Sequence, residues 1–100
     1  MIKKMFMAPG RKLISFEIEK KSVVYFDDNW KNGIQIYPLD KLMIKNLLAS
    51  RSANLKAMGL LIFDANKGEN LRQYKSCKDE QDLSEMITND CKLKGLLEIQ

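Results

Sequence analysis

Residues 12–26 read KLISFEIEKKSVVYF, and this stretch decides the fold because it contains two β-strands of different pattern. From Ile14 to Ile18 every second residue is apolar, which is the period of a strand with one buried face. The lysine pair at 20–21 indicates a turn into residues 23–26, where both faces of the next strand are apolar. We therefore predict an antiparallel hairpin.

The two strands of this hairpin differ in how much apolar surface they carry. Pairing across the turn places Phe16 opposite Tyr25 and both in the core. Val24 and Phe26 then lie on the opposite face, where something must cover them. The cover is either a helix of the same chain, which is the simpler interpretation, or a partner subunit.

The first 39 residues extend the hairpin into an antiparallel β-meander. Pro9-Gly10 has the φ angles that a tight turn needs, and Asn32-Gly33 is a strong hairpin signal. Trp30 falls in the loop before that second turn. The predicted strands are residues 3–7, 12–20, 23–26 and 34–37, with a loop at 27–33.

From Asp40 onwards the apolar spacing becomes that of helices. The run at 59–63 is apolar on both faces and is predicted to be a buried central strand. A strand, a helix and a final strand in residues 58–99 would form a parallel crossover. The predicted elements are a helix capped by Asp40 and ending near Asn54, the strand at 59–63, a turn at 66–68, a short helix near Leu71 and Tyr74, a helix from Asp79 to Gly95, and a strand at 96–99.

A chain of 100 residues with no linker or repeat supports one hydrophobic core. We predict a single compact α+β domain over residues 1–100. Residues 1–39 form the meander, and residues 40–100 form a helix-strand-helix-strand part.

The composition excludes several classes of enzyme. The chain has no histidine, so Ser-His-Asp and Cys-His catalysis are excluded within one chain. Two cysteines without an imidazole do not make a zinc site, and no phosphate-binding glycine loop is present. We expect no enzymatic activity and no cofactor, metal or small-molecule substrate.

One remaining route to catalysis uses carboxylates. Asp27, Asp28 and Asp64 follow predicted strands and could hold Mg²⁺ in a metal-dependent hydrolase. Acidic residues at strand ends are far more often turn-formers, which is the simpler interpretation. Glu19 and Lys21 have the E-x-K spacing of some nucleases, but they lie at a hairpin tip without an upstream catalytic carboxylate.

Charge and aromatic residues concentrate in the same half of the chain. Residues 1–56 carry 11 basic and 5 acidic residues, whereas residues 57–100 carry 6 and 8. Six of the eight aromatic residues lie in the first 37 positions. Aromatic rings between lysines suit single-stranded nucleic acid, but the scarcity of arginine argues against sequence-specific base recognition.

These features favour binding over catalysis. We expect a small non-enzymatic interaction protein, an adaptor or inhibitor, that binds a protein partner or itself through the N-terminal sheet. The alternative is a non-specific single-stranded nucleic-acid binding protein. No apolar run approaches the ~20 residues of a membrane span, so we expect a cytoplasmic protein that does not bind membranes. The predicted binding residues are Val24, Phe26, Trp30, Lys12, Lys20, Lys21 and Lys31.

Overall fold

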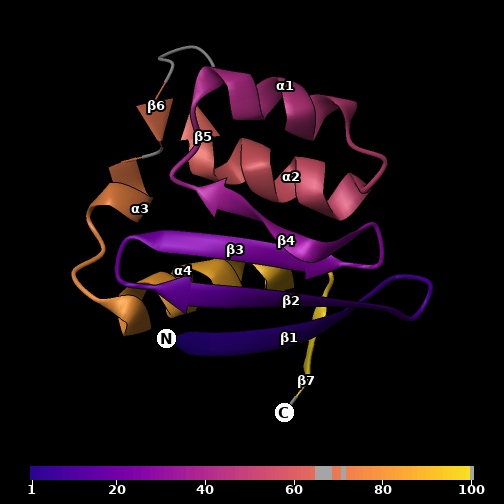
Figure 1. The fold of residues 1–100 in the computed structure, drawn as a ribbon. Helices are drawn as coiled ribbons and strands as arrows, with labels where there is room; N and C mark the ends of the chain where they lie inside the picture. Colours follow the sequence, from indigo (N-terminus) through magenta and orange to yellow (C-terminus); the bar gives the residue numbers. More distant parts are fainter. Residues whose placement is uncertain (65–68, 71, 100) are drawn as a thin grey trace.

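Four strands that follow one another in the chain form most of a five-stranded antiparallel sheet (Figure 1). The computed structural model describes residues 1–64, 69–70 and 72–99. The strand order is β4-β3-β2-β1-β7, so the last strand pairs with the first. This confirms the predicted α+β class and the meander. The strands are β1 (Ile2–Ala8), β2 (Lys12–Glu19), β3 (Ser22–Asp27), β4 (Trp30–Tyr37) and β7 (Leu97–Ile99).

The register of the hairpin is the predicted one. Phe16 lies opposite Tyr25, and both side chains are fully buried. The Phe6 ring meets Phe16 edge to face at a centroid distance of 5.8 Å, and Phe16 meets Tyr25 at 5.5 Å. Each such pair contributes about 0.5–1.5 kcal/mol beyond the area that it buries. These rings form the centre of the core.

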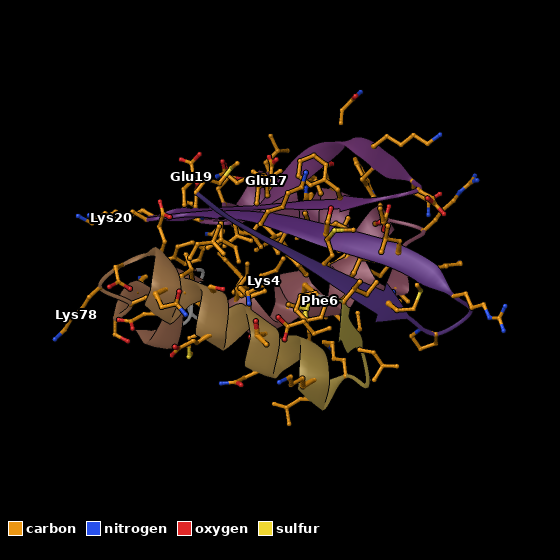
Figure 2. All side chains as sticks on the ribbon, turned by 90° about the horizontal axis from the view of Figure 1, so that it is seen from below. Lys4, Phe6, Glu17, Glu19, Lys20 and Lys78 are labelled. Carbon is orange, nitrogen blue, oxygen red and sulfur yellow. The ribbon has the colours of Figure 1, made fainter. Side chains whose placement is uncertain are left out.

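The helices lie on one side of this sheet (Figure 2). In that view Lys4 and Phe6 point from β1 toward α4, whereas Glu17 lies on the other side of the sheet. The core is therefore the layer between the sheet and the helices. The remaining elements are α1 (Lys41–Ala49), α2 (Ala53–Ile62), α3 (Arg72–Lys75), α4 (Glu80–Leu93) and the small sheet of β5 (Phe63–Asp64) and β6 (Glu69–Asn70).

The predicted central strand at 59–63 is wrong, because most of this run belongs to α2. The helix begins at Ser52, whose Oγ accepts a hydrogen bond from the Leu55 backbone N–H at 3.1 Å. Its buried residues, Leu55, Met58, Gly59 and Ile62, recur at helical spacing. Without that strand, the described residues form no parallel crossover, and β7 pairs antiparallel with β1 at the edge of the sheet.

The predicted turn at Asn32-Gly33 is also wrong. The chain turns earlier, where Oδ1 of Asp27 accepts hydrogen bonds from the backbone N–H groups of Asn29 at 2.8 Å and Trp30 at 2.9 Å. Gly33 instead lies inside β4, with φ +82° at an irregularity in the pairing with β3. A positive φ serves a bulge as well as a turn, so the sequence signal was ambiguous.

The last helix agrees with the prediction. Asp79 caps α4 by accepting a hydrogen bond from the Asp82 backbone N–H at 2.9 Å, and Gly95 follows the helix with φ +82°. Tyr74 of α3 is buried against Tyr37, with ring centroids 5.8 Å apart. The turn predicted at 66–68 and residue Leu71 lie outside the described residues.

Asp90 is a buried carboxyl on α4. It is 8% exposed, and its Oδ2 has no hydrogen-bond partner among the described residues. Burial raises the pKa of Asp90 to about 6, and the charge of Lys94 opposes that rise. Because the folded-state pKa lies above the ordinary value, the ionised carboxylate destabilises the fold at neutral pH.

We expect Asp90→Asn to increase the free energy of unfolding by about 1–2 kcal/mol near pH 7.5, since it removes this buried charge. The gain should shrink as pH falls from about 6 to about 4, where the wild-type carboxyl becomes protonated in both states. Urea denaturation of the wild type and of the variant at several pH values between about 4 and 7.5 measures this difference in the free energy of unfolding. Glu85→Gln, an exposed position on the same helix, is the control. A gain independent of pH would contradict the assignment.

Candidate interaction surface

The sheet has a second face, which we call the open face. Cross-strand partners point to the same side, so the register identifies its residues. None of the described helices lies over it (Figure 2). The open face consists of Lys3, Met5, Met7, Leu13, Ser15, Glu17, Val24, Phe26, Leu97 and Ile99, with the polar residues Glu19, Ser22 and Gln35 at its border.

The open face is arranged in three cross-strand rows. The first two rows are mainly apolar, and the third brings together one basic, one acidic, one apolar and one neutral polar residue. Leu97 and Leu13 are 71% and 43% exposed, so apolar surface is accessible at one end of the face. The rows are Leu97–Met7–Leu13, Ile99–Met5–Ser15–Phe26 and Lys3–Glu17–Val24–Gln35.

Val24 and Phe26 lie on the open face, as their pattern predicted. The described helices pack on the other side, so they do not supply the cover that the simpler interpretation required. Both side chains are half-buried and pack over Gly33 of the neighbouring strand. A Cβ at Gly33 would lie 2.6 Å from Cε2 of Phe26 and 2.8 Å from Cγ1 of Val24. The glycine therefore lets these side chains lie flat on the sheet.

The structure does not bring Trp30 to this face. Trp30 is the first residue of β4, not a loop residue, and its Nε1 donates a hydrogen bond to Ser50 Oγ at 3.2 Å. Ser50 follows α1, so the indole lies on the helix side and packs against the core. Trp30 and Phe26 therefore belong to opposite faces of the sheet.

The four predicted lysines are exposed, but they lie at different places around the sheet. Lys12 begins β2, and Lys20 and Lys21 form the turn at its far end. Eight residues of strand span about 25 Å, which separates the two positions. Lys31 lies on the edge strand β4. These lysines do not form one basic patch.

Five apolar residues of the open face were not among the predicted binding residues. Residues 5–8 are apolar on both faces, so alternation could not show which side of β1 is buried. The last strand was predicted, but its neighbour was not. Only the pairing of β7 with β1 extends the apolar rows to the sheet edge. The missed residues are Met5, Met7, Leu13, Leu97 and Ile99.

A cleft of about 520 Å³ lies beside the turn between β3 and β4, and Asp27 lines it. Asp27 Oδ2 accepts a hydrogen bond from the Tyr25 hydroxyl at 2.7 Å. Burial, together with this bond, raises the pKa of Tyr25, so the hydroxyl stays a donor. With its other oxygen bound to backbone N–H groups, Asp27 is committed to the turn.

The three aspartates of the metal hypothesis do not lie close together. Asp28 is exposed in the turn after β3, whereas Asp64 belongs to β5, at the opposite end of the molecule in Figure 1. Within the described ranges, no group of three or more Cys, Asp or Glu residues could hold a metal ion.

Comparison with protein-family models, with curated proteins and with solved structures found no match to this chain. Its function is therefore argued from its own residues. None of the helices in the described part of the chain is long and apolar enough to span a membrane.

We expect Gly33→Ala to lower the free energy of unfolding by about 2–3 kcal/mol, because it combines a left-handed φ with displacement of Phe26. Gly10→Ala is the matched control: its φ is +81°, but nothing lies within 4 Å of the added Cβ. It should cost about 1 kcal/mol. Chemical denaturation measures both variants. Equal losses would show that Phe26 does not pack over Gly33.

Proposed function

We propose that this chain is a non-enzymatic interaction protein that binds a protein partner through its open face. One observation carries the proposal: the sheet is covered by described helices on one side only, and its other side has two mainly apolar rows. Apolar surface that spans several strands favours a protein partner, since small monomeric proteins rarely leave such a patch in water.

The chemistry of the open face supports a protein partner over nucleic acid. Of the aromatic residues that the structure describes, Phe26 alone lies on this face, because the rings of Phe6, Phe16 and Tyr25 are in the core. Single-stranded nucleic acid needs several stacking rings between positive charges. The face instead carries Glu17 beside Lys3.

The two cysteines support a non-catalytic protein. Burial raises the pKa of Cys91 to about 12, and burial also raises the pKa of Cys77. Both thiols are therefore protonated at neutral pH, whereas a nucleophilic cysteine needs a lowered pKa. A buried reduced thiol such as Cys91 suits the cytoplasm, which we propose as the site of action.

The test is whether the tagged chain captures a protein from a native lysate, with and without nuclease treatment. We expect Met7→Lys to reduce capture at least about tenfold, because it places a charge in the centre of an apolar row. Leu48→Lys is the control, since Leu48 is an exposed leucine of α1 on the helix side. This variant should capture as much protein as the wild type.

Two results would contradict the proposal. The first is that nuclease abolishes capture, which would favour the nucleic-acid alternative. The second is that Met7→Lys and Leu48→Lys capture the same proteins as the wild type.

A further inference from the structure

We infer that the partner of the open face is a second copy of this chain, packed face to face about a two-fold axis between β1 and β2 and parallel to both strands. The inference rests on the proposed function and names its partner. It follows from the order of residues across the rows, which is self-complementary about that axis.

The charged row gives the first argument. Lys3 of β1 is paired with Glu17 of β2 in the register of the sheet. An axis between the two strands exchanges them, so Lys3 of each copy faces Glu17 of the other. Stacked sheets lie about 10 Å apart, which a lysine and a glutamate side chain can bridge together. The two copies thus place two opposite-charge pairs across the interface.

Lys3 and Glu17 are neighbours across the strands, but neither belongs to an ion pair within the described part of the chain. The ion pairs found there join Lys4 to Glu98 on the helix side and the N-terminal amine to Glu80. Lys3 is exposed and Glu17 is half-exposed. A second copy adds an opposite charge facing each of them, whereas an apolar partner would bury both charges without adding one.

The apolar rows give the second argument. Met7 pairs with Leu13 in the sheet, so the same axis brings Met7 of each copy onto Leu13 of the other. On one side of the axis the strand next to β2 is β3, and on the other side the strand next to β1 is β7. The axis therefore brings Phe26 of one copy opposite Ile99 of the other. Met7, Leu13, Phe26 and Ile99 each meet an apolar side chain, whereas Met5 meets Ser15. Aligned packing of two sheets has this geometry, with an angle of about 30° between strands.

The test uses charge reversal and mixing. Lys3→Glu gives a chain with two glutamates in the charged row, and Glu17→Lys gives a chain with two lysines. In the symmetric dimer either variant places like charges opposite each other, so its dissociation constant should rise at least about tenfold. Mixed in equal amounts, the two variants form a heterodimer in which both pairs are opposite. Sedimentation velocity should therefore show wild-type dimers, weakened dimers for each variant alone, and restored dimers in the mixture.

Restoration in the mixture separates pairing between chains from pairing within one chain, because each variant keeps like charges in its own row. Lys45→Glu, an exposed lysine on α1, is the matched control and should dimerise as the wild type does. A mixture that stays as weak as its components would overturn the inference, and so would a wild type that is monomeric at all concentrations. In that second case, loss of a captured protein by Met7→Lys would still support the proposed function.

Discussion

The structure depends on the burial of a cluster of three rings, Phe6, Phe16 and Tyr25, between the sheet and the helices. Side chains alternate along a strand, so burying these rings decides the side of every neighbouring residue. Met5 and Ser15 must then point away from the helices, with Phe26 in the same row. The open face is therefore a direct consequence of the core. A one-residue slip of β2 would exchange the two faces.

A strand with one apolar and one polar face could be predicted from the sequence. A segment that is apolar all round could not, because it suits a strand and a helix equally well. The alternation of β2 predicted its extent to within one residue, and pairing across the turn predicted its register with β3. Residues 59–63 suit a buried strand or a buried helix equally well, and the Ser52 cap decides for the helix. The hairpin turn is held by Oδ1 of Asp27, which accepts hydrogen bonds from the backbone N–H groups of Asn29 and Trp30. These bonds place the turn ahead of the asparagine-glycine pair that follows.

The candidate surface was half predictable for the same reason. Val24 and Phe26 were predicted because β3 is apolar on both faces, and the face that points away from the core needs a cover. Trp30 was assigned to a loop because the turn was placed four residues too late, and a tryptophan at the start of β4 belongs to the helix side. The contribution of β7 depends on a pairing between the two ends of the chain, which no local pattern indicates.

The central claim is that the open face is accessible in the single chain and becomes covered on association. Oxidation of methionine measured by mass spectrometry tests it directly, because Met5 and Met7 lie on that face while Met58 is buried in the core. The account predicts rapid oxidation of Met5 and Met7 in dilute solution, protection of both at high concentration, and constant protection of Met58. Exposed Met1 should react equally at both concentrations. Oxidation of Met5 and Met7 at the same rate in dilute and concentrated solution would contradict it.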